Sequence, residues 1–132
     1  LGFDLLYENK FEDAEIIECS IREKRIILTR DLGILKNGSV THGYWVRSTD
    51  SDEQIREVIH RFDLTNMVKP FTRCLVCNGQ LEFVDKQQIV DQIPPGTVRY
   101  FENFKKCMGC GKIYWRGSHF LDMKRRMNLI NI

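Results

Sequence analysis

The sequences CLVCNG (residues 74–79) and CMGCGK (residues 107–112) each hold two cysteines separated by two other residues. Thiolates at this spacing can bind one metal ion from a single tight turn, and two such turns complete a tetrahedral shell around zinc. Asn78 and Gly111 follow the last cysteine of each pair, and both residue types tolerate the left-handed backbone that such a turn needs. The pattern predicts a zinc ribbon with four ligands, Cys74, Cys77, Cys107 and Cys110.

Other uses of four cysteines are possible in principle. Two disulfides would require an oxidising compartment, and a redox-active pair would require a preceding βαβ unit. We favour one zinc ion per chain, and we expect it to be structural because four sulfurs leave no position for a reactive water. The fifth cysteine, Cys19, lies in an apolar helical stripe and is interpreted as a small buried residue.

Cysteines used for metal binding favour a reducing interior, so the sequence predicts a cytoplasmic protein. No apolar run approaches the ~20 residues that span a bilayer, and no membrane partner is expected. The net charge of +2 hides an asymmetry, because residues 1–69 carry 13 acidic against 10 basic side chains and residues 70–132 carry 5 against 10. An acidic first part beside a basic second part is typical of a cation site next to a phosphate-binding surface, although ordinary solvated charge gives the same pattern.

Apolar periodicity predicts alternating strands and helices in the first part of the chain. Strands are expected at residues 3–7, 25–29 and 43–46, and helices at residues 13–22, with Asp13 as a plausible N-cap, and at residues 51–62, with a capping box from Ser51 to Gln54. This alternation favours an α/β fold with a parallel sheet. We place a domain boundary near residue 70, which gives domains 1–69 and 70–132.

The long interval between the two cysteine pairs must contain structure of its own. Strands are expected at residues 81–84, 98–101 and 112–115, with a helical turn at residues 87–92 and a break at Pro94-Pro95-Gly96. A final helix with Ser118 as its N-cap is expected after the second pair.

Three carboxylates follow or precede elements of the predicted parallel sheet. Asp31 comes just after the strand that ends at Thr29, Asp13 begins the first helix, and Glu8 follows the first strand. Ligands gather beyond the carboxyl ends of parallel strands, and carboxylates placed together there bind magnesium or manganese. Such a site suits phosphodiester hydrolysis. The alternative is that Asp13 is only a helix cap and Asp31 only a turn residue.

The chain resembles a known family, the Mut-seven C-terminal ribonuclease domain. The resemblance rests on an ordered set of segments across nearly the whole chain: Leu1-Gly2-Phe3-Asp4, Asp13-Ala14-Glu15-Ile16-Ile17, Thr29-Arg30-Asp31, Pro70-Phe71-Thr72-Arg73-Cys74, and Tyr114-Trp115-Arg116-Gly117-Ser118-His119. It implies a PIN-like nuclease fold with an appended zinc ribbon and a C-terminal helix. It also implies RNA as substrate, and Asp13 and Asp31 as members of an acidic site that binds magnesium or manganese.

The family opens with a strand that carries another catalytic Asp, followed by a helix, and this chain lacks both. We therefore expect a PIN-like sheet without its first strand, in a truncated form of a longer protein that is poorly active as it stands. Loss of that strand exposes sheet edges, so self-association through an edge is plausible.

The basic residues around the last helix form the predicted RNA-binding surface: Arg116, His119, Lys124, Arg125 and Arg126. Such residues can neutralise phosphates, and Tyr114, Trp115 and His119 could stack on unpaired bases, although Tyr114 and Trp115 could equally fill the small core of the ribbon. The sequence thus predicts a metal-dependent ribonuclease. A non-catalytic nucleic-acid-binding module and a protein-interaction module are the alternatives.

Overall fold

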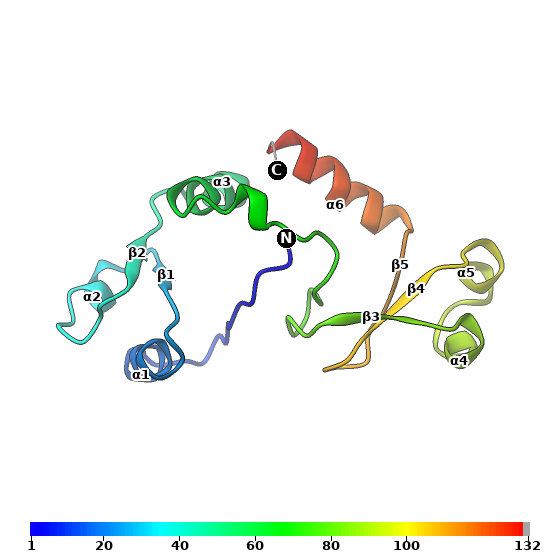
Figure 1. The fold of residues 1–132 in the computed structure, drawn as a ribbon, viewed down its shortest axis with the longest axis horizontal. Coiled ribbons are helices and arrows are strands. Elements are labelled where there is room, and N and C mark those ends of the chain that lie inside the picture. Colours follow the sequence, from blue (N-terminus) through cyan, green and yellow to red (C-terminus); the bar gives the residue numbers. More distant parts are fainter. Residues whose placement is uncertain (131–132) are drawn as a thin grey trace. The chain divides into compact units, whose positions relative to one another are not determined.

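The computed structural model describes residues 1–130 of the 132-residue chain, and its backbone forms two compact units (Figure 1). One unit is Tyr7–Leu64. The other combines Leu1–Leu6 with the residues from Thr65 onward, so the first six residues join the cysteine-bearing part of the chain. The domain boundary predicted near residue 70 stays a prediction. Within residues 1–130, no helix is both long and apolar enough to cross a membrane.

The unit Tyr7–Leu64 contains a parallel pair of strands with three helices. Its elements are α1 (Asp13–Glu23), β1 (Ile27–Thr29), α2 (Leu32–Leu35), β2 (Gly43–Trp45) and α3 (Ser51–Arg61). Strands β1 and β2 pair in parallel, with Leu28 opposite Tyr44. The α/β class and the parallel pairing predicted from the sequence are confirmed, and the PIN-like details stay a prediction.

Three isoleucines from successive elements form the core of this unit. Ile17 of α1, Ile27 of β1 and Ile34 of α2 are buried together, and Ile16, Leu35 and Val40 pack against them. The helical spacing of Ile16 and Ile17 with the β-branched run at residues 26–27 explains why the sequence predicted α1 and β1 correctly. The four-residue α2 was missed, because one turn leaves almost no periodic signal.

The helix caps differ from those expected. Glu12, not Asp13, is the N-cap of α1, and the Glu15 carboxylate accepts a hydrogen bond from the Glu12 N–H at 2.8 Å. Asp50, not Ser51, is the N-cap of α3, because its carboxylate accepts the N–H groups of Asp52 and Glu53, both at 3.0 Å. The expected capping box at Ser51 is therefore wrong.

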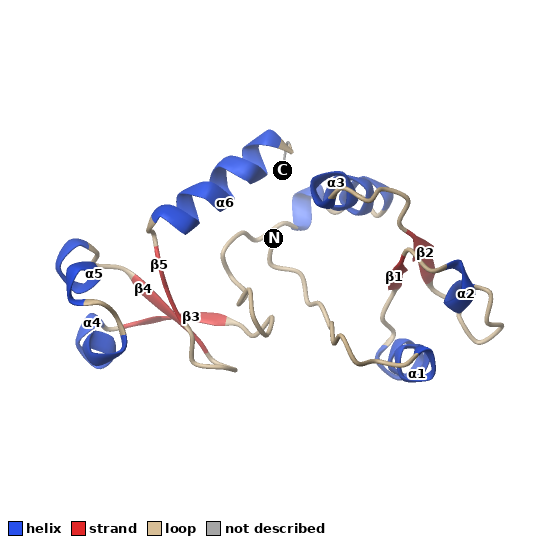
Figure 2. Ribbon diagram, turned by 180° about the vertical axis from the view of Figure 1, so that it is seen from behind, coloured by secondary structure: helices blue, strands red, loops and turns tan. Residues whose placement is uncertain are grey.

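The second unit is built on a three-stranded antiparallel sheet with strand order β3-β4-β5. Its elements are η1 (Thr65–Met67), β3 (Leu81–Val84), α4 (Lys86–Ile89), η2 (Val90–Gln92), α5 (Pro95–Tyr100), β4 (Phe104–Cys107), β5 (Ile113–Trp115) and α6 (Ser118–Leu129). Helices α4 and α5 lie beyond one end of this sheet, as both views show (Figures 1 and 2). Their apolar residues Ile89 and Val98 pack with Ile93 and the β4 residue Phe104 in a second core.

Two expectations for this unit are corrected. Residues 98–100 of the strand expected at 98–101 form the second half of helix α5, because Pro95 stands at the start of a helix, where its fixed φ and missing N–H are tolerated. The actual strand, β4, follows at Phe104–Cys107. The last helix begins at Ser118 as expected, but its N-cap is Gly117.

The first residues form no strand, so the strand expected at residues 3–7 is also wrong. Their backbone is hydrogen-bonded instead to the side chain of Asn78. The Asn78 amide oxygen accepts a hydrogen bond from the Leu5 N–H at 2.7 Å, and its amide nitrogen donates one to the Phe3 carbonyl at 3.2 Å. The Leu1 carbonyl accepts from the Lys69 N–H at 2.9 Å. Gly2 has a φ of +86° and passes so close to the Lys69 carbonyl that a Cβ would lie 2.2 Å from its oxygen.

The core of the unit Tyr7–Leu64 can be tested with two isoleucines that differ in burial. Ile34→Ala removes a side chain that is only 4% exposed, and we expect it to lower the free energy of unfolding by about 2–5 kcal/mol. Ile21→Ala, at a position 57% exposed, should change it by less than about 0.5 kcal/mol. Urea unfolding followed by circular dichroism measures both, and equal losses would contradict this core.

Candidate metal centre and acidic residues

The first cysteine pair lies on a tight turn that points backbone N–H groups at sulfur. The Cys74 N–H donates to the Gly79 carbonyl at 2.8 Å, and the Asn78 N–H donates to the Cys74 carbonyl at 3.1 Å. Asn78 takes a φ of +59°, as its residue type predicted. This turn places the Val76 N–H 3.4 Å from Cys74 Sγ and the Gly79 N–H 3.4 Å from Cys77 Sγ.

The second pair repeats the same turn. The Cys107 N–H donates to the Lys112 carbonyl at 2.9 Å, and the Gly111 N–H donates to the Cys107 carbonyl at 3.0 Å. Gly111 has a φ of +79°, and it stands where Asn78 stands in the first turn. The N–H groups of Gly109 and Cys110 lie 3.3 and 3.4 Å from Cys107 Sγ. Both turns thus arrange backbone dipoles that favour thiolates over thiols.

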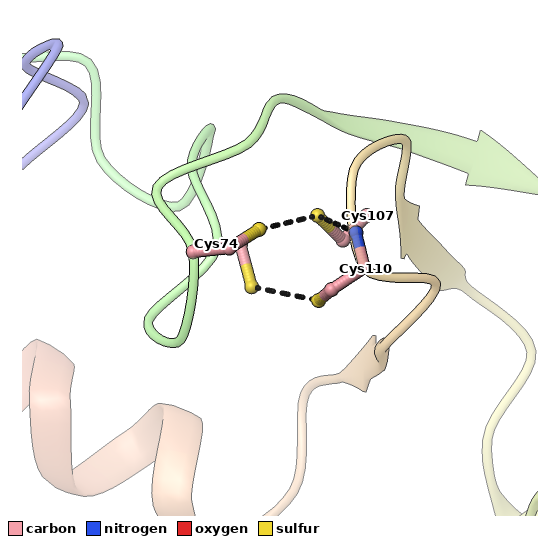
Figure 3. A group of neighbouring side chains, drawn as sticks. Cys74, Cys107 and Cys110 are labelled. Atoms are coloured by element: carbon pink, nitrogen blue, oxygen red, sulfur yellow. Dashed lines mark hydrogen bonds between the residues drawn. The ribbon is translucent and has the colours of Figure 1, made fainter. Parts of the chain in front are cut away.

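The four sulfurs lie together between the two turns. All four ligand atoms lie within 4.8 Å of one another, and Figure 3 shows Cys74 on one turn facing Cys107 and Cys110 on the other. The distance between Sγ atoms is 3.6 Å for Cys74 and Cys110, and 3.4 Å for Cys77 and Cys107. A zinc ion with four sulfurs at 2.3 Å separates neighbouring sulfurs by about 3.8 Å. The spacing and the ligand type therefore fit a tetrahedral zinc site.

Glycines allow the two turns to approach this closely. A Cβ on Gly79 would lie 2.9 Å from Cys107 Sγ, and a Cβ on Gly109 would lie 3.3 Å from Cys77 Sγ. A side chain at Gly79 would thus push apart the sulfurs that must share one ion. The glycines in the two cysteine motifs are needed for the contact between the turns as well as for the shape of each turn.

Tyr114 of β5 supports the first turn from the neighbouring strand. Its hydroxyl lies 3.1 Å from Cys74 Sγ and accepts the Leu75 N–H at 3.0 Å. Burial opposes ionisation of Cys74, but the hydrogen bonds from Tyr114 and from the backbone N–H groups of Cys77 and Val76 outweigh it and lower its pKa to about 6. Burial and the same contact with Cys74 raise the pKa of Tyr114 well above its usual value, so the hydroxyl keeps its proton.

The sulfurs also oppose one another's ionisation. The backbone N–H of Lys112 lowers the pKa of Cys110, but loss of solvation and the three neighbouring sulfurs raise it to about 11. One thiolate in this group therefore makes the next harder to form. A divalent cation at the centre of the group removes this conflict, because it stabilises all four thiolates at once.

The structure does not gather the acidic residues in the way that it gathers the cysteines. In the described part of the chain, the four cysteines are the one group of three or more His, Cys, Asp or Glu residues with ligand atoms close enough to share an ion. Asp13 is the first residue of α1. Asp31 lies just beyond the carboxyl end of β1, where its Oδ1 accepts the Gly33 N–H at 2.7 Å as the N-cap of α2. Glu8 comes just before a turn that leads into α1, and its carbonyl accepts the Phe11 N–H at 3.3 Å.

Two residues that the sequence analysis missed hold the backbone beyond β2. The Arg30 guanidinium donates from Nη1 to the carbonyls of Val46, Arg47 and Ser48, at 3.3 Å for Val46 and 2.7 Å for Ser48. Glu57 of α3 accepts the N–H of Arg47 at 3.0 Å and that of Ser48 at 3.3 Å. The segment after β2 is thus held on its carbonyls by an arginine and on its N–H groups by a carboxylate.

Glu57 is a charged anchor rather than a surface residue. Its side chain is 18% exposed, and it also accepts the Tyr44 hydroxyl at 2.9 Å. The N–H of Arg47 is the main cause of a lowered pKa, with further contributions from Tyr44 and Ser48 that together outweigh the loss of solvation. No signal in the sequence indicates this role, since Glu57 lies on the side of α3 away from the apolar stripe of Ile55, Val58 and Ile59, and its partners lie outside the helix.

The predicted RNA-binding residues are all exposed. Arg116 precedes α6, and its guanidinium carbon lies 5.6 Å from the centroid of the Phe120 ring. The other four lie in α6 itself: His119, Lys124, Arg125 and Arg126. Arg125 is 3.5 Å from Asp122, which reduces the positive charge that this helix presents.

Comparison with known protein families gives a match over nearly the whole chain. The Mut7-C RNAse domain family matches residues 1–127. The chain belongs to this family. The predicted resemblance is therefore confirmed over nearly the whole sequence, and it suggests a nuclease or another RNA-related function. No curated protein and no solved structure gives a match.

The metal centre leads to a prediction about zinc content. We expect the purified chain to contain one zinc ion. Cys110→Ser should lose most of this zinc. It should also lose the thermal unfolding transition of the cysteine-bearing unit, because binding of the ion stabilises that fold. Cys19→Ser is the matched control, since Cys19 lies outside the group. Metal analysis and calorimetry measure both. Equal zinc in all three proteins would contradict the site.

The Glu57 anchor leads to a prediction about pH. Because the folded protein lowers the pKa of Glu57, this carboxylate stabilises the fold at neutral pH, and the contribution is lost as the pH falls below about 4.3 and through the folded value. We expect Glu57→Gln to be less stable than the natural protein at pH 7 and the difference to shrink toward pH 3. The exposed Glu53→Gln should show little difference across this range in urea titrations.

Proposed function

We propose that this chain is a metal-dependent ribonuclease that hydrolyses RNA phosphodiester bonds, with a structural zinc ribbon that helps to hold the RNA. The match to the Mut7-C RNAse domain family over residues 1–127 carries this proposal. The position of Asp31 at the carboxyl end of a parallel strand supports it, because ligands of such sheets gather there.

The acidic residues suit a catalytic metal of a particular kind. Magnesium is commonly held by one or two carboxylates together with water and substrate phosphates, and it does not need a complete cage of protein ligands. Asp31 fits this role because its Oδ1 is used as a helix cap while the side chain stays exposed. Asp13 is the second candidate ligand, at the start of α1. Bound by these residues, magnesium or manganese would polarise a phosphoryl oxygen and activate a water.

The residues of the chain itself supply position and charge. Two hydrogen bonds fix Asp31: its Oδ1 accepts the Gly33 N–H at 2.7 Å, and its own N–H donates to Thr29 Oγ1 at 2.9 Å. Arg30 and Glu57 hold the segment after β2, and β2 is the hydrogen-bonded neighbour of the strand that leads to Asp31. In this proposal both are positioning residues, which keep the carboxyl edge of the two strands in one shape while RNA binds.

A second candidate is a non-catalytic RNA-binding module. The observation that favours it is that Asp31 already has a structural role as a helix cap and that Asp13 lies in the first turn of a helix, where acidic residues stabilise the dipole. The two candidates predict different results for a substitution that keeps the cap but removes the charge.

Asp31→Asn is that substitution, because asparagine caps helices about as well as aspartate does. We expect it to abolish both RNA cleavage and the rise in melting temperature that manganese causes, while the melting temperature without manganese stays nearly unchanged. Cleavage of a labelled single-stranded RNA and thermal unfolding measure these effects. Cleavage that survives in Asp31→Asn would favour the non-catalytic module.

Asp63→Asn provides the control for that experiment. Asp63 is exposed and has a φ of +51°, a conformation that asparagine also accepts. The substitution removes the same charge at a position that the proposal does not use, so both cleavage and the manganese effect should match those of the natural protein.

The basic helix leads to a prediction about salt. Replacing Lys124, Arg125 and Arg126 together with glutamine should weaken RNA binding and reduce the slope of log K against log salt by up to about 2, because each phosphate contact on a single strand contributes about 0.7. In the control protein, glutamine replaces Lys10, Lys36 and Lys69, which changes the net charge by the same amount. Equal slopes in the two triple variants would count against this surface.

A further inference from the structure

One face of the β3-β4-β5 sheet carries an exposed aromatic residue that neither core uses. Phe83 of β3 is opposite Lys105 of β4, which is opposite Tyr114 of β5, so these three side chains lie in one row on one face. The adjacent row of Val84, Phe104 and Trp115 lies on the other face and belongs to the core. Phe83 lies on the edge strand β3 and is 76% exposed.

Two lysine side chains lie over the aromatic rings of this row. Lys105 Nζ lies 4.9 Å from the centroid of the Phe83 ring and donates to the Phe71 carbonyl at 3.0 Å, so it is held against one face of the ring. Lys112 Nζ lies 5.7 Å from the centroid of the Tyr114 ring at the other end of the row. This face therefore combines an exposed aromatic ring with two positive charges. Such a combination suits a ligand with a flat ring to stack and phosphates nearby.

A cleft of about 330 Å³ begins at Phe83. Its wall is formed by the end of β3, the start of α4 and the residues before β4, and it includes the side chains of Gln88 and Asn103. Within residues 1–130, neither of these side-chain amides is hydrogen-bonded to the protein. Lys86 and Glu102 pair at 2.9 Å in the same wall. The cleft thus offers free donors and acceptors beside an aromatic ring, which is how unpaired bases are bound.

From this arrangement we propose a binding site for one unpaired base of single-stranded RNA, in which the base stacks on Phe83 and its edge enters the cleft toward Gln88 and Asn103. The flanking phosphates lie toward Lys105 and Lys112. This site rests on the proposed function for its ligand, and it is distinct from the basic residues of α6. The sequence analysis did not assign a role to Phe83, because a phenylalanine in a predicted strand reads as a core residue.

The test measures binding in the Asp31→Asn protein, so that cleavage does not interfere. The probe is a fluorescein-labelled eight-nucleotide adenosine RNA, followed by anisotropy at several salt concentrations. Two further probes are an abasic oligonucleotide of equal charge and a duplex RNA whose bases are paired. We expect Phe83→Ala to weaken binding of the single strand by between about 5-fold and about 150-fold, the range for loss of one stacked base.

The salt slope and the other probes separate stacking from charge. Phe83→Ala should leave the salt slope of the single strand unchanged, because it removes no phosphate contact. Its binding to the abasic and duplex probes should equal that of the parent protein. Phe83→Trp should keep the affinity and show additional quenching of tryptophan fluorescence when the adenosine RNA binds, since a new indole would then stack on a base.

Tyr100→Ala is the matched control. Tyr100 is an aromatic residue of the same unit, 78% exposed, and it lies outside the row and the cleft. Equal loss of affinity in Tyr100→Ala and Phe83→Ala, or unchanged binding in Phe83→Ala, would overturn the base site. The proposed ribonuclease function would still stand if Asp31→Asn abolished cleavage. A parent protein that bound no single-stranded RNA at low salt would overturn both.

Discussion

Four sulfur atoms held within 4.8 Å of one another are the constraint on which the cysteine-bearing unit depends. Each turn aims backbone N–H groups at sulfur and so favours thiolates, while loss of solvation and the neighbouring sulfurs raise the pKa of Cys110 to about 11. A divalent ion resolves this opposition. The three-stranded sheet then follows from the turns, because β3 leaves the first turn, β4 ends in the second at Cys107, and β5 continues from it.

The unit Tyr7–Leu64 depends on a different kind of constraint. Its core is small, and the backbone beyond β2 is held by charged side chains, Arg30 on its carbonyls and Glu57 on its N–H groups. These bonds place the end of β2 beside the end of β1, where Asp31 stands. Hydrogen bonds to ionised groups therefore help to order the carboxyl edge of the strands.

The sequence predicted the features that are local in the chain. The cysteine spacing identified the four residues whose sulfurs the structure brings together, and a residue with left-handed backbone after each pair was expected from Asn78 and Gly111. Helix α1 and strand β1 followed from apolar spacing. The strand expected at residues 98–101 failed because Pro95 was interpreted as a break rather than as the first residue of a helix. Partners far apart in the chain, such as Glu57 with Arg47 or Phe83 with Lys105, leave no local pattern.

The contact between Asn78 and the first residues has a consequence for the order of folding. Leu5 and Phe3 hydrogen-bond to the side chain of Asn78, more than seventy positions away, and Asn78 belongs to the turn that we expect zinc to stabilise. Closing so large a loop is entropically costly until the acceptor is already in place. The first segment should therefore dock late, after metal loading, so that its protection from proteases reports whether the ion has been acquired.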